Sequence, residues 1–152
     1  MINSRDLNEL TGDARARALD LKEMCAKDDI SLLVTSTYRD IEFQQYLYSL
    51  GRTVKTKLVR GRIVKQGIVT RARPGTSYHN FRMAFDVVPL VDGRPNWSTN
   101  REGMRRWLHI AQIGKSLGLQ WGGDFKTIRD LPHFQYTEGK TIAMLRKEHD
   151  IA

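Results

Sequence analysis

The sequence predicts a single α+β domain in which helices pack on a small, mostly antiparallel sheet. Three observations support this prediction. The 152 residues suit one domain with an ordinary core, because 40% of them are hydrophobic and 28% charged. Apolar residues at helical spacing alternate along the chain with short runs of branched apolar residues. Glycine and proline turns separate these short runs, as in a sheet of consecutive antiparallel strands.

The N-terminal third predicts a helix, a strand and a second helix. Apolar side chains recur at steps of three and four residues over about residues 5–27, which favours an amphipathic helix. Residues 30–36 are rich in branched side chains and predict a buried strand. Asp40 can cap the second helix, and Gly51 can end it. Cys25 is the only cysteine, which excludes an internal disulfide and a cysteine-based zinc site, and its place in the first helical stripe predicts burial.

A basic hairpin is expected at residues 54–70, with Gly61 and Gly67 at its turns or bulges. The segment 51–76 contains eight basic residues and no acidic one, so it accounts for the whole net charge of +8. Such a local excess can bind a polyanion. A solvated hairpin whose charges aid solubility is an equally open interpretation. The basic residues are Arg52, Lys55, Lys57, Arg60, Arg62, Lys65, Arg71 and Arg73.

The C-terminal half predicts further short strands and two helices. Thr99 and Glu102 have the spacing of a capping box, which would open a helix that ends at Gly118. Glycine and proline mark the intervening turns. The remaining expected elements are turns at 73–76, 92–95 and 121–124, strands at 84–88 and 132–136, and a last helix at 138–148.

Four residues in two short segments carry the chemistry. Two imidazoles and one carboxylate, His79, Asp86 and His133, are a common ligand set for catalytic zinc, which leaves one position for water. Asp130, three residues before His133, could act as a base on that water. A histidine beside a strand is more often a hydrogen-bonded structural residue, and an Asp–His pair can be a plain hydrogen bond. Asp86, however, lies among apolar residues and requires a metal, an arginine or backbone donors.

These segments resemble a known family, the zinc peptidases that cut peptidoglycan peptides. Its members include D-alanyl-D-alanine carboxypeptidases and the L-alanyl-D-glutamate endopeptidases of bacteriophage endolysins. The resemblance covers about residues 30–136 in five stretches, and it implies a hedgehog or D-Ala-D-Ala peptidase-like fold. The matching stretches are Thr35–Arg39 with Gln44, Leu47, Tyr48, Gly51 and Arg52; Val69–Gly75; Ser77, His79, Ala84 and Asp86; Leu117–Phe125; and Asp130–His133.

The resemblance implies a role for each matched residue. His79, Asp86 and His133 would bind zinc, and Asp130 would take a proton from the attacking water and pass it to the leaving amine. Arg39 would stabilise the oxyanion or hold a substrate carboxylate; its alternative is a surface ion pair with Asp40 or Glu42. Two polar residues would contact the peptide backbone, with a helix face and a loop cap as their structural alternatives: Gln44 and Ser77.

Two departures from the family pattern stand out. Arg82 occupies a position where the family usually has glycine, which predicts a different local turn or a side chain that reaches into or away from the cleft. The chain is also longer than short family members between Gly51 and Val69, so residues 52–70 read as a basic hairpin insertion. We expect this hairpin to attract an anionic wall or outer-membrane polymer.

The sequence therefore predicts a phage-type endolysin, a monomeric zinc endopeptidase that cuts the peptidoglycan stem peptide between L-Ala and D-Glu. Without the apolar core of a signal peptide or a membrane span, it is expected in the host cytoplasm until a partner opens the inner membrane. Three alternatives stay open. They are a D-Ala-D-Ala carboxypeptidase, a zinc-containing binding module without activity, and a basic nucleic-acid-binding protein supported only by the hairpin.

Overall fold

The computed structural model describes all 152 residues. A five-stranded antiparallel sheet forms its centre, with strand order β1-β4-β7-β6 and β5 paired to the far end of β4. The strands are β1 (Ser31–Ser36), β4 (Ala84–Val91), β5 (Arg94–Pro95), β6 (Gln120–Trp121) and β7 (His133–Gln135). The helices are α1 (Gly12–Lys27), α2 (Ile41–Ser49), α3 (Arg101–Ser116) and α4 (Ile142–Glu148), with short 3-10 helices η1 (Leu7–Glu9), η2 (Tyr78–Phe81) and η3 (Gly122–Asp124).

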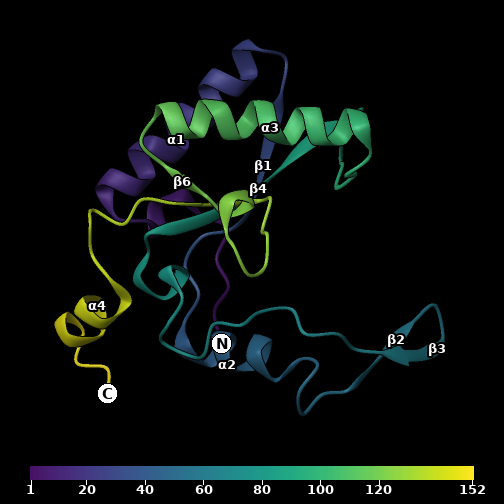
Figure 1. Cartoon of the computed structure of the whole chain (residues 1–152), viewed down its shortest axis with the longest axis vertical. Coiled ribbons are helices and arrows are strands. Elements are labelled where there is room, and N and C mark those ends of the chain that lie inside the picture. Colours follow the sequence, from purple (N-terminus) through teal and green to yellow (C-terminus); the bar gives the residue numbers. More distant parts are fainter.

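The main core lies between the sheet and helices α1 and α3, which pack side by side (Figure 1). Phe85 of β4 and Phe134 of β7 are register partners, and their rings stack with centroids 5.9 Å apart. Gly114 of α3 sits directly over Phe134, since an added Cβ would come within 2.5 Å of that ring. Cys25 is fully buried in this core, as the sequence predicts.

Alternation along the strands separates the core from the functional residues. Successive side chains of a strand point to opposite faces of the sheet. Phe85 and Phe134 face the helices, so the next register pair, Asp86 and His133, faces the other side. The prediction of an α+β fold with a mostly antiparallel sheet is confirmed, and the sheet proves to be entirely antiparallel. No helix combines the length and apolar character needed to cross a bilayer.

Three predicted helix starts are wrong. The first predicted helix is broken, because Leu10 is extended and the backbone N–H of Thr11 donates to the carbonyl of Arg82, so α1 begins only at Gly12. The N-cap of α3 is Asn100, not Thr99: the Asn100 side chain accepts from the N–H of Gly103. The last helix begins at Ile142 rather than 138, capped by the side chain of Thr141.

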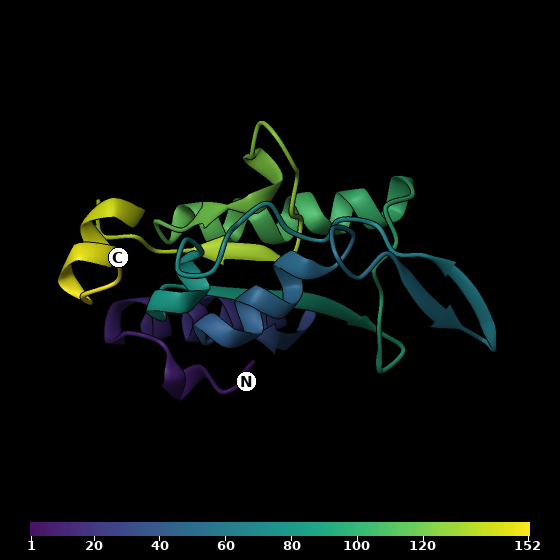
Figure 2. The same cartoon turned by 90° about the horizontal axis from the view of Figure 1, so that it is seen from below.

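The predicted hairpin projects away from the rest of the chain (Figures 1 and 2). We call residues 52–70 the arm. Its strands β2 (Thr56–Val59) and β3 (Arg62–Lys65) form a separate two-stranded antiparallel sheet, and all eight strand residues are exposed. Its turn is Arg60-Gly61, both with positive φ, as expected for a two-residue hairpin loop.

Candidate metal centre

The register of β4 and β7 brings together two residues that are 47 positions apart. Asp86 and His133 are direct partners across these antiparallel strands, on the face away from α1 and α3. Nδ1 of His133 lies 3.3 Å from Oδ1 of Asp86. A seven-residue spacing cannot predict how His79 joins them, because that depends on the turn between η2 and β4.

His79 lies in η2, and a capping box forms at the N-terminus of this 3-10 helix. The Ser77 side chain accepts from the backbone N–H of His79, and Oδ1 of Asn80 accepts from the N–H of Ser77. Nδ1 of His79 donates to the carbonyl of Thr37 at 2.8 Å, since a carbonyl can only accept. This bond fixes the tautomer and leaves Nε2 of His79 free, 3.3 Å from Oδ1 of Asp86.

The three side chains fit a metal ion. Their ligand atoms all lie within 4.8 Å of one another. Nε2 of His79 and Oδ1 of Asp86 are both buried, and neither makes a hydrogen bond, which is costly for polar atoms without a further partner. Tetrahedral ligands at zinc bond lengths of roughly 2.0–2.1 Å stand about 3.3 Å apart, which matches both His–Asp separations. The two-imidazole, one-carboxylate donor set also matches catalytic zinc.

Burial and neighbouring charges shift the pKa of each of the three ligand residues. Burial alone would raise the pKa of Asp86, but the flanking imidazoles of His79 and His133 hold that pKa well below its usual range. Burial lowers the pKa of His79 and outweighs the attraction of Asp86, so this ring is held neutral, as a metal ligand must be. For His133 burial opposes the charged form, yet its contacts with Asp86 and the charge of Asp130 raise the pKa overall.

Arg39 lies beside the cluster and holds the second oxygen of the buried carboxylate. Its Nη2 donates to Oδ2 of Asp86 at 2.9 Å, and its Nε donates to Oγ of Ser36 at 3.1 Å. The alternative surface ion pair with Asp40 or Glu42 does not form, because both carboxylates pair with the N-terminal amine instead. Arg39 therefore orients Asp86 and also lines the cleft described below.

Asp130 stands next to the cluster on the loop before β7. Its Oδ2 lies 3.9 Å from Nδ1 of His133, and about half of its side chain is exposed. Partial burial and the nearby charge of Asp86 raise the pKa of Asp130. The loop approaches η3 closely: a Cβ on Gly122 would come within 2.2 Å of the Asp130 carbonyl. Nε1 of Trp121 donates to the carbonyl of Leu131 and fixes the same loop.

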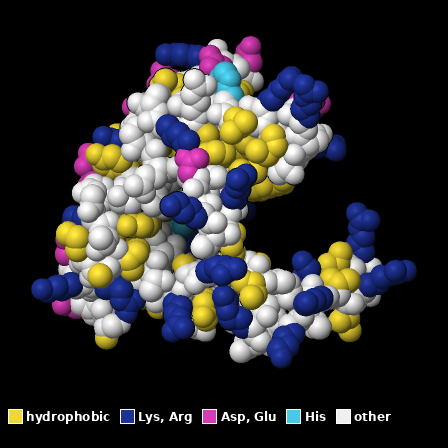
Figure 3. All heavy atoms as spheres, viewed as in Figure 1, with side chains coloured by type: hydrophobic (Ala, Val, Ile, Leu, Met, Phe, Trp, Pro, Cys, Tyr) yellow, Lys and Arg dark blue, Asp and Glu magenta, His cyan; other side chains and the backbone are white.

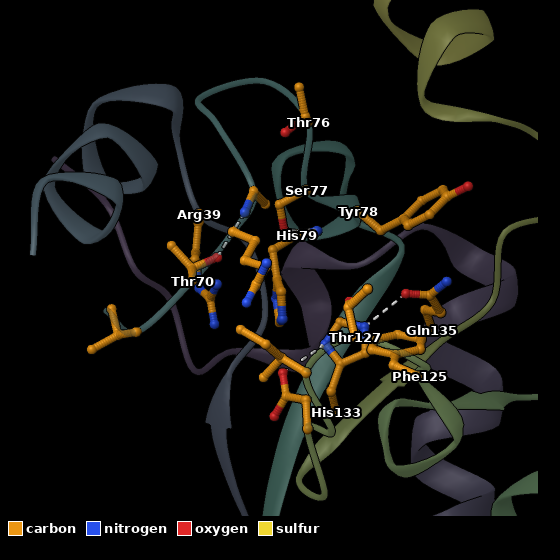
Figure 4. A pocket seen from close by; sticks show the side chains of 15 residues that line it. Arg39, Thr70, Thr76, Ser77, Tyr78, His79, Phe125, Thr127, His133 and Gln135 are labelled. Carbon is orange, nitrogen blue, oxygen red and sulfur yellow. Dashed lines mark hydrogen bonds and ion pairs between the residues drawn. The ribbon is translucent and has the colours of Figure 1, made fainter. Parts of the chain in front are cut away.

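Arg39, His79, Asp130 and His133 line a cleft of about 350 Å³ (Figure 4). Residues 69–72, which include the last two residues of the arm, line one side, and the loop with Phe125, Thr127 and Ile128 lines another. Ser77 both caps η2 and lines the cleft, so its predicted contact with a peptide is sterically open. Gln44 is fully buried beneath this wall, where its Nε2 donates to the carbonyl of Ala72, and its predicted substrate contact stays a prediction.

Two glutamines that the sequence analysis missed orient His133. Nε2 of His133 donates to Oε1 of Gln135 at 2.7 Å, and Nε2 of Gln135 donates to Oε1 of Gln120 at 2.7 Å. This chain fixes the tautomer in which Nδ1 of His133 faces Asp86. The available signal was position: Gln135 follows His133 by two residues in a strand, and therefore shares its face.

The backbone conformation of Arg82 explains why the family usually has glycine at this position. It ends η2 in the left-handed conformation, with φ 63°, which glycine adopts at less cost. Its side chain points away from the cleft: the guanidinium lies 3.8 Å from the ring centre of Tyr38 and pairs with Glu9. Of the two predicted orientations, the structure therefore shows the one that leaves the cleft unobstructed. His109 and His149 lie outside the site, and His109 pairs with Asp28.

Comparison with known proteins agrees with this geometry. A family described as D-alanyl-D-alanine carboxypeptidase matches residues 70–136. The peptidoglycan L-alanyl-D-glutamate endopeptidase CwlK of Bacillus subtilis (strain 168) is 37% identical over 120 residues, which cover 76% of this chain and 66% of CwlK. The L-alanyl-D-glutamate peptidase of Listeria phage A118 is 25% identical over 131 residues, 86% of this chain and 39% of that protein. The chain thus spans about two thirds of one relative and well under half of the other.

A solved structure confirms the fold independently. The L-Ala D-Glu endopeptidase ChiX of Serratia marcescens superposes with a TM-score of 0.55 over 99% of this chain and 93% of its own, at 19% identity. The matched family, the 37% identical relative and the His-Asp-His cluster together define a metallopeptidase. More particularly, the chain belongs to the peptidase M15 family, and both metal-ligand segments lie inside the matched region.

Proposed function

We propose that this protein is a zinc endopeptidase that hydrolyses the bond between L-Ala and D-Glu in the peptidoglycan stem peptide. The observation that carries the proposal is the convergence of His79, Asp86 and His133 beside Asp130, at an open cleft that both histidines and Asp130 line. The activity in the names of CwlK and the phage A118 peptidase supports this choice of bond. The D-Ala-D-Ala carboxypeptidase alternative remains testable, because the matched family bears that description.

Nε2 of His79, Oδ1 of Asp86 and Nδ1 of His133 would hold the zinc ion. A bound zinc ion lowers the pKa of water and polarises the scissile carbonyl. The chain prepares for it by keeping His79 neutral and Asp86 ionised. The backbone carbonyl of Thr37 and the side chain of Gln135 orient the two rings from behind.

Asp130 supplies the proton transfer. It is a carboxylate with a raised pKa and a half-exposed side chain, so it can accept a proton from the attacking water and deliver it to the leaving amine. Arg39, held in place by Ser36 and Asp86, presents its guanidinium to the same cleft and stabilises the negative charge that develops on the carbonyl oxygen.

Digestion of purified peptidoglycan tests the activity. Wild type, His133→Ala and the control His109→Ala are compared, with products read by mass spectrometry. New N-terminal D-Glu ends from wild type and the control, and none from His133→Ala, support the proposal. Release of D-Ala alone identifies a carboxypeptidase instead. Absence of products from zinc-loaded wild type leaves the binding-module and nucleic-acid interpretations.

We further propose that the protein serves as a phage endolysin, acting as a monomer after the inner membrane has been opened. The support is the likeness to a phage peptidase. Expression in a Gram-negative host with and without a membrane-permeabilising agent tests this role. Culture turbidity should fall only with the agent, and not for Asp130→Asn. Lysis without permeabilisation, or lysis by the variant, would refute the role.

A further inference from the structure

The arm presents apolar side chains that nothing in the fold covers. Leu58 and Ile63 face each other across β2 and β3, and 71% and 77% of their surfaces are exposed. Val59 and Val64 are also exposed, on the opposite face of the ribbon. Apolar side chains scattered singly over a surface are ordinary, but a contiguous exposed group marks a contact site. Burial of a Leu or Ile side chain contributes roughly 1.5–3 kcal/mol, so a partner that covers this pair gains affinity.

The same ribbon carries a dense positive charge. Lys55, Lys57, Arg60, Arg62 and Lys65 lie within eleven residues, and none of them forms an ion pair. No acidic residue lies between 51 and 76. In the space-filling view, dark-blue and yellow side chains occur together on the projecting arm, across a hollow from the body of the protein (Figure 3).

The cations and the exposed apolar side chains of the arm together indicate which kind of partner it binds. A second copy of the arm would bring five positive charges against five, which opposes pairing. An anionic polymer would neutralise the cations but leave Leu58 and Ile63 in water. An anionic lipid surface satisfies both features, because its headgroups attract cations and its acyl boundary receives apolar side chains. We propose that the arm docks on anionic lipid bilayers by inserting the Leu58–Ile63 pair between its flanking cations.

Contacts of Arg52 at the base of the arm connect the arm to α2 and to the segment beside the cleft. Nη1 and Nη2 of Arg52 donate to the carbonyls of Tyr48 and Thr70, and the guanidinium stacks over the Tyr48 ring at 3.7 Å. This residue therefore ties α2 to the segment where the arm returns. Residues 69–72, which include the last two residues of the arm, line the cleft. Docking of the arm on a membrane therefore keeps the cleft close to the membrane surface. The proposal does not depend on which bond the enzyme cuts.

Vesicle co-sedimentation tests the docking. Full-length protein is mixed with vesicles of phosphatidylglycerol and phosphatidylethanolamine, or of phosphatidylcholine alone. We expect wild type to sediment with the anionic vesicles only. Leu58→Ser/Ile63→Ser should weaken sedimentation at least tenfold, whereas the control Leu19→Ser/Leu108→Ser, which alters half-exposed apolar residues on α1 and α3, should not.

A charge series separates attraction from insertion. Arg60 and Lys65 each lie two residues from the Leu58–Ile63 pair and therefore share its face. Arg60→Gln/Lys65→Gln should weaken binding about 30-fold, since each cation near an anionic surface contributes about 1 kcal/mol. Arg101→Gln/Arg105→Gln on α3 is the matched control. Circular dichroism of every variant confirms folding. Equal binding to both vesicle types, no vesicle binding, or unchanged binding by the serine variant would overturn the proposal. Binding to inorganic polyphosphate but not to vesicles would identify a polymer-binding arm instead.

Discussion

The metal centre and the arm show two opposite uses of a pair of antiparallel strands. In β4 and β7, alternate side chains face a closed core, and the register pair Asp86 and His133 is held between that core and the cleft. In β2 and β3 every residue is exposed on both faces. Strands β4 and β7 pack against the core and receive hydrogen bonds from other elements. Strands β2 and β3 have only the hydrogen bonds of their own ladder.

This difference indicates where precision and where adaptability are required. A ligand cluster works only if its atoms are held within a fraction of an ångström, which requires buried supports such as Thr37 and Gln135. A surface that meets a lipid headgroup layer needs charge and apolar area, but no fixed partner atom. Changes in the centre should therefore be costly, and changes in the exposed strands β2 and β3 should leave stability and catalysis almost unaltered.

The largest expected effect is on catalysis. Asp130→Asn keeps the shape of the side chain but removes the base, so kcat should fall about 10²–10⁴-fold while the zinc content stays unchanged. Peptidoglycan hydrolysis and metal analysis measure the two quantities. Lys65→Gln on the arm is the contrasting variant and should leave hydrolysis of soluble fragments within twofold. A drop of less than fivefold for Asp130→Asn would show that another group acts as the base.

The next effect compares one substitution in the two regions. Leu21 is fully buried against the sheet, whereas Leu58 is 71% exposed. Leu21→Ala should lower the free energy of unfolding by about 2–5 kcal/mol, through lost burial and a cavity. Leu58→Ala should change it by less than about 0.5 kcal/mol. Urea unfolding measures both. Comparable losses would mean that the arm packs against the body in solution.

A pH-dependent effect follows from Cys25 in the core. Burial raises the pKa of its thiol from 9.0 to about 11. The unfolded chain therefore loses this proton first, so the contribution to stability is complete below about pH 9 and is lost as the pH rises toward 11. At 1.36 kcal/mol per pKa unit, the loss amounts to about 3 kcal/mol at most.

Urea midpoints of wild type and Cys25→Ala between pH 8 and 11 isolate the cysteine from lysines and tyrosines that titrate in the same range. The stability difference between the two proteins should shift against wild type above pH 9. Native Cys25 should also resist iodoacetamide at pH 8. Parallel curves, or rapid alkylation of the native protein, would show that the thiol is accessible.

The smallest expected effect concerns the support of His133. Gln135→Leu removes the acceptor for Nε2 while filling its space, and should weaken zinc binding about 10–100-fold, as other losses of such supporting hydrogen bonds do. Competition with a zinc chelator measures the affinity directly. Gln66→Leu on the arm is the control. Unchanged affinity for Gln135→Leu would mean that packing alone orients the ring.

Local patterns predicted much of the fold because local physics decides those features. Asp40 caps α2 as expected, Arg60-Gly61 turns the arm, and the strand around Asp86 lies where its apolar run indicates. The predictions that were wrong concern helix starts, by one residue at α3 and by several residues at α1 and α4. Asn100 prevails over Thr99 because its side chain reaches the N–H of Gly103, a geometry that spacing alone cannot rank.

For the site, the sequence by itself determined the residue types and, through the resemblance, predicted which four would act together: His79, Asp86, Asp130 and His133. Only the tertiary structure decided that Nε2 of one ring and Nδ1 of the other face the same carboxylate oxygen, and that Arg39 holds its second oxygen. The reason is physical. Chemistry resides in side chains, which a sequence states outright, whereas ring orientation depends on strand register and on hydrogen bonds from residues distant in the chain.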